Sequence, residues 1–445
     1  MPLYAGVCET NITPPVGVWM GGYAFRPTPC VAIHDELHAR AIVFHDGGTP
    51  VGIVSADLIG FSDGMVQRVR QSVFEAVGIP PEALLLNASH THGGPNVKEF
   101  NAMGPIDEAY VDILTRKIVG AVRQAAETLK PAQLSYGRAP VQVGVNRRAA
   151  VAGGGTTIGH NYAGPIAPYV DVLGVSEPSG GLFAIMFTHA CHGTTLGGDN
   201  LRITADYCGY AADAVRRQTD GKATPIFLQG CSGNINPMHR ATFSAAAQNG
   251  RLLGGAALQA WQDAGPLMED EPISHAVRKV QLPLVAPPPI EACREAAARC
   301  EQQLAADRAA GGVGAILNSE GLLAYARLEL QIAEAGSPPE PAQMEVQRIT
   351  VQGASFVGMP AEVFVQYALD LDAQALGPVF TLGCTNGAHN YLPTAAAYEL
   401  GGYETNHAHR YYHSLMYSAE SERIVREALY DLLGVSEPDW TPYSA

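Results

Sequence analysis

The sequence predicts an α/β protein in which mixed sheet layers are flanked by helices. Short apolar runs typical of buried strands alternate along the chain with segments of helical periodicity. Hydrophobic residues make up 47% of the chain and charged residues 16%, a composition typical of a globular protein with a large apolar interior. With 445 residues the chain is long enough to bury such an interior, and we expect a single domain over residues 1–445.

The first part of the chain shows the alternation. Turn-rich segments form an entry loop that leads into a strand at residues 41–45. The elements expected next are a strand at 51–56, a helix at 62–77, a strand at 84–87 and a helix of about twenty residues that ends before Pro131. Such alternation favours buried strands in an α/β layer.

The later parts continue the pattern with one interruption. We expect strands at 134–145, 169–175, 182–187, 225–228, 346–357 and 380–382, helices at 205–217 and 419–433, and a glycine-rich loop at 153–164. Residues at about 285–345 differ, because two helical stretches separated by Gly311 and Gly312 stand between proline-rich segments. We interpret this region as a helical insertion that forms a lid or an oligomer contact. No internal repeat is evident.

Two histidines follow the strand predicted at 84–87. His90 and His92 can share one face of an extended segment, and imidazole is the commonest ligand for zinc. Alternatively, they are strand-end histidines that hydrogen-bond to nearby backbone. Further polar loops around His192 and Ser232 also follow predicted strands. Because ligands bind at the carboxyl ends of strands in open α/β sheets, the sequence predicts a metal site at these strand ends.

Charge and composition exclude several classes of partner. The formal net charge is -15 and the basic residues are not clustered, so we expect no nucleic-acid partner. No run of eighteen apolar residues is present, so we expect no stable membrane insertion. The N-terminal residues lack the pattern of a signal peptide, and the eight cysteines are scattered, typical of free thiols in a reducing compartment. We therefore predict a cytoplasmic protein.

Several short motifs occur together in a characteristic order. They are His90-Thr91-His92-Gly93-Gly94-Pro95, Asn146-Arg147, His192, Ser232-Gly233-Asn234, Pro360-Ala361-Glu362, Thr385-Asn386 followed by Tyr391, and Tyr403. In this order they resemble the catalytic N-terminal domain of the neutral/alkaline non-lysosomal ceramidase family. The resemblance covers nearly the whole chain, and it identifies the chain as a soluble member without the C-terminal immunoglobulin-like domain.

The resemblance implies a zinc site and assigns its residues. The residues matching the family's four ligands of one Zn²⁺ per chain are His90, His192, Glu362 and Tyr391. His192 is selected over His189 because it precedes by fourteen positions the helix start expected at Asp206. Among the other matches, Tyr403 polarises the scissile carbonyl, His92 and Arg147 lie near the substrate head group, and Ser232 lies beside the metal.

This donor set suits metal-assisted hydrolysis. Two imidazoles and a carboxylate form the open zinc site of hydrolases, in which the pKa of a water falls to about 7. We predict a zinc-dependent amidohydrolase that cleaves a small-molecule, linear N-acyl amide, with catalytic roles for Tyr403, His92 and Ser232. A zinc esterase or lactonase and a non-catalytic acyl-ligand-binding protein are the alternatives, and a homo-oligomer is left open.

Some residues also have simpler interpretations. Glu362 suits a helix N-terminus, and Ser232 suits a turn. His189 and Cys191 could belong to the core. Arg148 stands beside Arg147, so the sequence leaves open which of the two faces the site.

Overall fold

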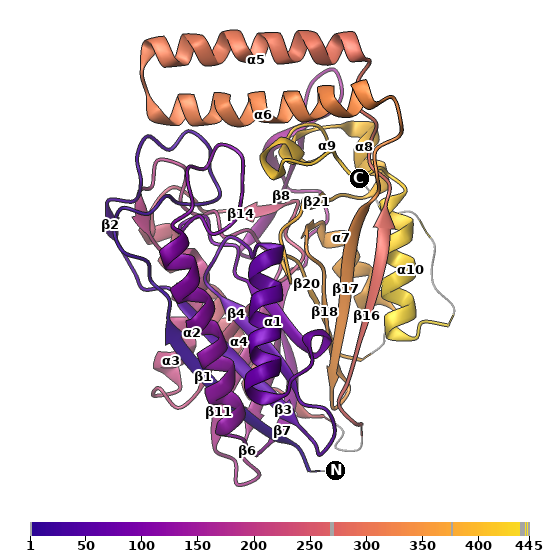
Figure 1. Ribbon diagram of the computed structural model, residues 1–445. Coiled ribbons are helices and arrows are strands. Elements are labelled where there is room, and N and C mark those ends of the chain that lie inside the picture. Colours follow the sequence, from indigo (N-terminus) through magenta and orange to yellow (C-terminus); the bar gives the residue numbers. More distant parts are fainter. Residues whose placement is uncertain (1, 268–270, 375–376, 437–440, 442, 444–445) are drawn as a thin grey trace.

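The computed structural model describes residues 2–267, 271–374, 377–436, 441 and 443. It confirms the α/β fold class, since several mixed sheets are flanked by helices (Figure 1). Among these described residues, no helix is long and apolar enough to cross a membrane.

Three sheets share one topology. In each, three antiparallel strands are followed by a helix that crosses to a fourth strand, which pairs in parallel with the third. In the first sheet these elements are β1 Tyr4–Asn11, β3 His38–His45, β4 Val51–Ala56, α1 Asp63–Val77 and β5 Leu84–Ala88. In the second they are β7 Gln133–Pro140, β10 Tyr169–Ser176, β11 Leu182–His189, α3 Asp206–Gln218 and β13 Thr224–Gln229. In the third they are β16 Ser274–Leu282, β17 Ala342–Val351, β18 Ala354–Gly358, α7 Val365–Ala373 and β20 Val379–Leu382.

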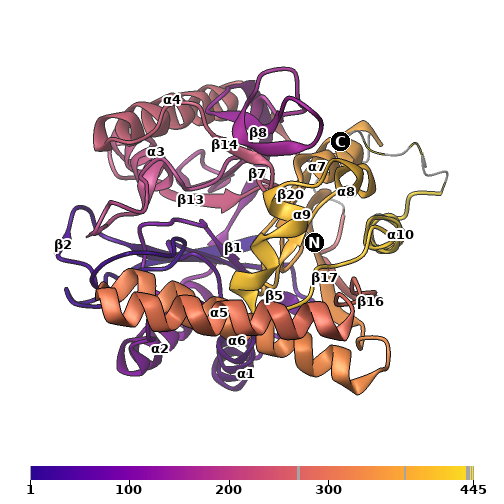
Figure 2. The ribbon, with the colours of Figure 1, turned by 90° about the horizontal axis from the view of Figure 1, so that it is seen from above.

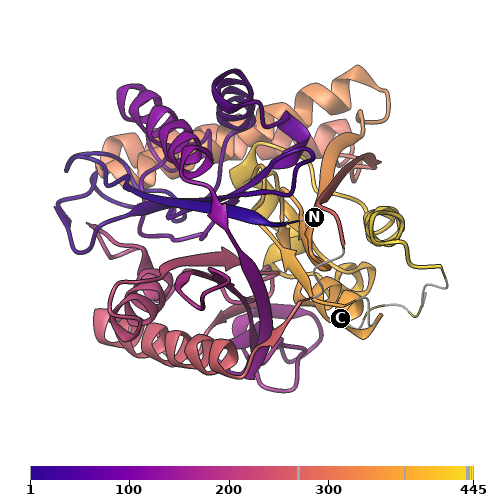
Figure 3. The ribbon, with the colours of Figure 1, turned by 90° about the horizontal axis from the view of Figure 1, so that it is seen from below.

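The fourth strands of the three sheets meet at the centre of the molecule. Isolated bridges join Asn87 of β5 to Thr385 beyond β20, and Gly230 beyond β13 to Leu382 of β20. The fully buried Asn87 side chain accepts a hydrogen bond from Gln229 N at 2.7 Å and donates to the carbonyl of Gly383 at 2.9 Å. Figures 2 and 3 show the sheets from above and below, the first in indigo to purple, the second in magenta to pink and the third in orange.

Helices cover the outer faces of the sheets. α1 and α2 Glu108–Glu127 pack on the first sheet, α3 and α4 Phe243–Gln262 on the second, and α10 Ser421–Leu433 on the third. The shorter elements are β2 Ala32–Ile33, η1 Pro81–Ala83, β6 Lys130–Pro131, β8 Gly144–Ala150, β9 Thr156–Asn161, β12 Arg202–Ile203, β14 Ile235–Pro237, β15 Gly265–Pro266, β19 Glu362–Val363, β21 Tyr391–Leu392, α8 Ala395–Leu400, α9 Tyr403–Asn406 and η2 Ala408–Tyr412.

Several predicted elements need correction. Residues 4–11, expected in the entry loop, form β1, and the strand expected at 134–145 is two strands, β7 and β8. The glycine-rich loop contains β9, and α4 was not predicted. The strand expected at 346–357 is a hairpin, because Gln352 and Gly353 adopt φ angles of 47° and 83° and turn the chain back. Local apolar patterns do not reveal such turns when both flanking strands are buried.

Two long helices lie across one end of the molecule (Figure 1). They are α5 Ile290–Ala310 and α6 Val313–Ala335, which pack on each other as an antiparallel hairpin. Gly311 and Gly312 separate them with φ angles of 72° and 126°, which only glycine adopts readily. The apolar pattern of the sequence predicts the second helix only near residues 322–333, and in the structure it begins nine residues earlier, at Val313. That this hairpin is an insertion into a single domain stays a prediction.

Candidate active site

The predicted site residues lie where parallel strand pairs end. His90 and His92 follow β5, and His192 follows β11. Glu362 follows β18, and it pairs with Tyr391 in a short parallel ladder between β19 and β21. These loops from the three sheets converge at one place, as expected for ligand sites at the carboxyl ends of strands.

Imidazole and carboxylate atoms face each other in the centre of the site. The Nε2 atom of His192 lies 2.8 Å from Glu362 Oε2, and the Nε2 atom of His90 lies 3.4 Å from the same oxygen. His90, His92 and His192 offer ring nitrogens that all lie within 4.8 Å of one another. Every one of these groups is buried or nearly so, which leaves little water to solvate a charge there.

The outer nitrogens of two of the histidines are held by backbone carbonyls. His90 Nδ1 lies 2.7 Å from the carbonyl oxygen of Ile59, and His192 Nδ1 lies 2.6 Å from that of Ser232. A carbonyl accepts only, so both Nδ1 atoms carry a hydrogen, and each ring in its neutral form would present its Nε2 lone pair to Glu362. A ring nitrogen lone pair and a carboxylate oxygen are both acceptors, so at these distances each Nε2 atom and Glu362 Oε2 need a proton or a cation between them. The donor set therefore fits a metal ion.

His92 differs from the other two histidines. Its Nε2 lies 3.3 Å from His90 Nε2, but its buried Nδ1 has no hydrogen-bond partner among the described residues. Metal-binding histidines almost always donate their second N–H to a carbonyl or carboxylate, and His92 lacks that support. The arrangement favours His90 and His192 as ligands and leaves His92 beside them.

Tyrosines form one side of the site. The Tyr391 ring is stacked on His192 with 6.5 Å between ring centroids, and Tyr403 lies edge-on to Tyr391 at 5.9 Å. Tyr412, which the sequence did not single out, donates its hydroxyl hydrogen to Glu362 Oε1. It stands in a segment rich in His, Arg and Tyr, from 407 to 413, and that density of polar aromatic residues is the signal that could have found it.

Two adjacent arginines share one carboxylate. Arg147 Nε and Arg148 Nη1 each lie 2.7 Å from an oxygen of Glu404, and all three side chains are almost fully buried. Arg147 faces the site, where its Nη1 lies 3.5 Å from His192 Nε2. Arg148 turns away and donates to the carbonyl of Gly401 at 2.8 Å. The structure thus resolves which of the two arginines faces the site.

The buried charges shift the titration of the site in the metal-free protein. Burial opposes the charged form of Glu362, but His90 and His192 outweigh it and hold the pKa of this carboxyl well below its usual range. Burial, reinforced by Arg147, lowers the pKa of His192 to about 4. Burial acts against the charged form of His90 as well, yet Cys384 and Glu362 raise its pKa well above the ordinary value. Glu362 is therefore ionised at neutral pH.

Ser232 reaches the site through its backbone. Its carbonyl oxygen accepts the His192 Nδ1 hydrogen, and the turn that it begins is closed by a bond from Ile235 N to the same carbonyl at 2.9 Å. His189 is a core residue, since it is 3% exposed and donates from Nδ1 to the carbonyl of Tyr169. The catalytic role assigned to Ser232 stays a prediction.

Comparison with known proteins identifies the family of this chain. A model of the family described as neutral/alkaline non-lysosomal ceramidase, N-terminal, matches residues 4–256. The chain belongs to this family. A search of curated proteins finds no match.

Solved structures of ceramidases share the fold. The crystal structure of neutral ceramidase from Pseudomonas aeruginosa is 19% identical with a TM-score of 0.74, over all of this chain and 76% of that one. A second structure, titled as a ceramidase complexed with C2, is 17% identical with a TM-score of 0.76, over all of this chain and 77% of that one. At these identities the likeness establishes the fold.

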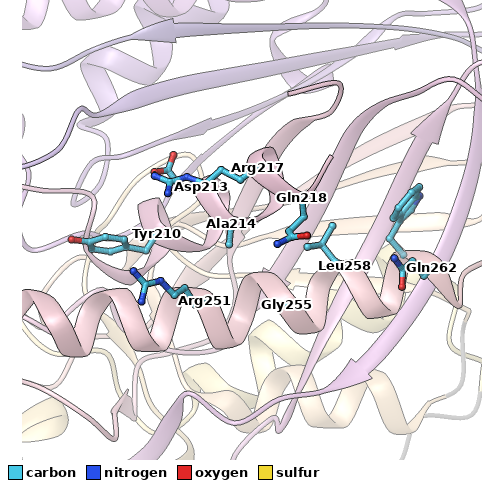
Figure 4. Close-up of a pocket in the computed structure, with 10 residues that line it drawn as sticks. Tyr210, Asp213, Ala214, Arg217, Gln218, Arg251, Gly255, Leu258 and Gln262 are labelled. Carbon is cyan, nitrogen blue, oxygen red and sulfur yellow. The ribbon is translucent and has the colours of Figure 1, made fainter. Parts of the chain in front are cut away.

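In this ceramidase-family chain a cavity of about 310 Å³ opens onto the site. The lining includes His92, Arg147, Glu362 and five tyrosines, which are Tyr23, Tyr391, Tyr403, Tyr411 and Tyr412. A larger cavity of about 580 Å³ lies elsewhere, between α3 and α4 (Figure 4). Its lining has no histidine, and its one carboxylate, Asp213, is paired with Arg217. The smaller cavity is the one equipped for chemistry.

Proposed function

We propose that this protein is a zinc-dependent amidohydrolase that cleaves a linear, N-acyl type amide in a small-molecule substrate. The single observation that carries the proposal is the pair of histidine Nε2 lone pairs directed at one oxygen of Glu362. Membership of the ceramidase family supports amide hydrolysis, and ceramide is itself an N-acyl amide.

The residues that would hold one Zn²⁺ per chain are His90, His192, Glu362 and Tyr391. Nitrogen and carboxylate ligands are those that zinc prefers, and an open position among them suits a catalytic ion. Tyr391 is the unusual member of the set. Burial, opposed by Arg147, raises the pKa of its phenol well above the ordinary value, so Tyr391 would act as a ligand only where a bound cation stabilises the phenolate. When bound, zinc would supply Lewis acidity and a water molecule of lowered pKa.

The protein's own side chains would do the remaining work. Burial raises the pKa of Tyr403 above its ordinary value, so its hydroxyl stays protonated and can donate to the carbonyl oxygen as negative charge develops there. Burial, together with the charges of His90 and His192, lowers the pKa of His92 far below its ordinary value, so it is neutral and free to accept a proton at Nδ1 or Nε2. His92 would pass that proton to the leaving amine nitrogen.

Arg147 and Tyr412 would orient the reacting groups. Among the described residues, the buried Nη2 of Arg147 has no partner of hydrogen-bond geometry, and this N–H is the donor left for substrate. Tyr412 occupies Oε1 of Glu362 and so presents Oε2 to the histidines. Orienting a ligand carboxylate in this way is typical of the residues that surround a metal site.

The test combines metal analysis with hydrolysis. We expect about one zinc per chain by elemental analysis, and cleavage of N-acyl amines of graded chain length that chelation abolishes and zinc restores. His192→Ala should lose both metal and activity, whereas His92→Ala should keep the metal and lose most of the activity. Loss of metal from His92→Ala would instead indicate a three-histidine site. Activity indifferent to chelation would overturn the proposal, and faster cleavage of matched esters would favour the esterase alternative.

Some wider features stay proposals. We propose a single domain over residues 1–445 with a helical insertion at about 285–345, and a supporting role for Ser232 beside the metal. Whether the chain forms a homo-oligomer is left open. All eight cysteines are unpaired in the described structure, which suits the reducing environment of the proposed cytoplasmic location.

A further inference from the structure

Two arginines at the cavity are, unlike Arg147, not paired with a carboxylate among the described residues. Arg240 lines the cavity, and Arg26 lies behind it with 3% of its surface exposed. Among the described residues, neither guanidinium has a carboxylate within ion-pair distance. In a chain with a net charge of -15, unneutralised cations at a catalytic cavity indicate an anionic ligand.

Arg240 is positioned relative to the proposed metal ligand His192. Its Nε donates to the carbonyl of Thr194 at 2.9 Å, and the next residue donates from Ala241 N to the carbonyl of Thr195 at 2.7 Å. Thr194 and Thr195 belong to the loop that begins at His192. The outer nitrogens of Arg240 stay at the cavity mouth, where Nη2 lies 3.5 Å from Tyr23 Oη.

Arg26 contributes its positive charge to the cavity although it is not one of the residues that line it. Its Nη1 donates to the carbonyl of Gly21 at 2.6 Å and its Nη2 to the carbonyl of His92 at 2.7 Å. These bonds use two of its five N–H groups, its buried Nε has no hydrogen-bond partner among the described residues, and its guanidinium lies over the Tyr23 ring at 5.3 Å. Its buried charge therefore adds to the positive potential around Tyr23, whereas Arg240 is exposed and can be reached from solvent.

Apolar side chains line another part of the cavity, and α6 packs beside it. Phe25, Phe100, Met103 and Tyr411 line it. Two glycines of α6 pack closely on the backbone of these segments. A Cβ atom added at Gly314 would lie only 2.4 Å from the carbonyl oxygen of Phe25, and one added at Gly321 only 2.8 Å from Ala102 N. An acyl group of modest length can lie against these apolar side chains, and the charged group of the substrate is left to Arg240.

We propose that the amide cleaved here carries a carboxylate on its amine half, as in an N-acyl amino acid, and that Arg240 binds this carboxylate. The inference rests on the proposed function. A guanidinium matches a carboxylate with two parallel hydrogen bonds, which neutral amino alcohols cannot form. In the reaction the oxygen of water bonds to the acyl carbon, the C–N bond breaks and a proton moves to the nitrogen. The products are a fatty acid and a free amino acid.

Matched substrates test the proposal. N-hexanoylglycine and N-hexanoylethanolamine differ only in carboxylate against hydroxymethyl, as do N-hexanoylalanine and N-hexanoylalaninol. With the zinc-loaded full-length protein we expect kcat/KM to favour the acids by about tenfold or more, mainly through KM, since hydrogen bonds to a charged group contribute about 1.5–3 kcal/mol. Arg240→Gln should remove most of that preference, and Arg240→Lys should keep part of it.

Arg217→Gln is the matched control. Arg217 is an exposed arginine of α3 in the other cavity, paired with Asp213 at 3.4 Å, and its loss should leave both activities unchanged. Equal cleavage of acids and alcohols, or a preference that survives Arg240→Gln, would overturn the inference and leave the amidohydrolase intact.

If no amide were cleaved, the proposed function would fail, and calorimetry with N-hexanoylglycine would decide the inference. Binding that is lost in Arg240→Gln but kept in Arg217→Gln would support the carboxylate site. Absence of binding would overturn it.

Discussion

Replacing Glu404 by glutamine should both destabilise the fold and weaken the site. Glu404 is 2% exposed and bonds Arg147 and Arg148, each at 2.7 Å. Burial opposes its charged form, but the two arginines hold its pKa below the ordinary 4.5. Stability from this cluster is therefore present above pH 4.5 and is lost as the pH falls through the lowered folded-state pKa.

The size of the expected loss in unfolding free energy follows from the burial of all three charges. Removing one partner of a buried ion pair costs about 3–5 kcal/mol, because the charge left behind is neither solvated nor paired. Glu404→Gln leaves two guanidinium groups in that state, although the amide oxygen can still accept one hydrogen bond. We expect the free energy of unfolding to fall by about 3–5 kcal/mol. Adding Arg148→Met should recover about 1 kcal/mol or more, since one uncompensated charge is then removed.

Urea unfolding monitored by tryptophan fluorescence measures the loss, with the zinc concentration held constant. Glu177→Gln is the control, since Glu177 pairs with Lys130 at 2.6 Å while 40% exposed, and its loss should cost far less stability than the loss of Glu404. Activity should fall as well, because Arg147 loses the group that holds it beside His192. A Glu404→Gln variant no less stable than Glu177→Gln would refute this account of the cluster.

Two further predictions concern the buried polar groups of the core. Asn87→Leu should cost about 3–5 kcal/mol, because it leaves buried groups such as Gln229 N unsatisfied. Asn200→Leu, which loses two exposed hydrogen bonds to Arg202, should cost clearly less in the same unfolding assay. Burial lowers the pKa of His189 from 6.5 to about 4, so the unfolded chain binds more protons between these pH values and stability falls as the pH drops from 6.5 to 4. In His189→Gln the loss of unfolding free energy between pH 6.5 and pH 4 should be smaller by about 3 kcal/mol. An unchanged pH dependence of the unfolding free energy would contradict the lowered pKa of His189.

The sequence was a good guide to elements whose pattern is local. The strand at 51–56 and the helix capped by Ser62 lie where their apolar patterns predicted. The motif order located His90, His192, Glu362 and Tyr391, and the structure gathers these distant residues in one place. Motif order could do this because these residues lie in segments that follow strands of the three parallel pairs, and the ends of those strands converge.

Features that depend on contacts between distant segments escaped prediction. The partnership of Glu404 with two arginines 256 and 257 residues away has no local pattern, and neither has the hydrogen bond from Tyr412 to Glu362. The strand β1 was missed because its residues mix polar and apolar types while its burial comes from α2 and β3. Such elements are defined by what packs on them after folding.

The repeated topology explains why the site lies at the centre of the molecule. Each sheet contains one parallel pair, and a parallel pair requires a helical crossover that leaves both strands ending on the same side. Because the fourth strands β5, β13 and β20 are joined at the centre, the three sets of strand ends face one another there. Loops from each set then need only a few residues to bring ligands together. Asn87 bonds to groups adjoining the other two sheets and lies three residues before His90, so a substitution at a residue that is not itself a proposed ligand can still disturb the proposed metal site.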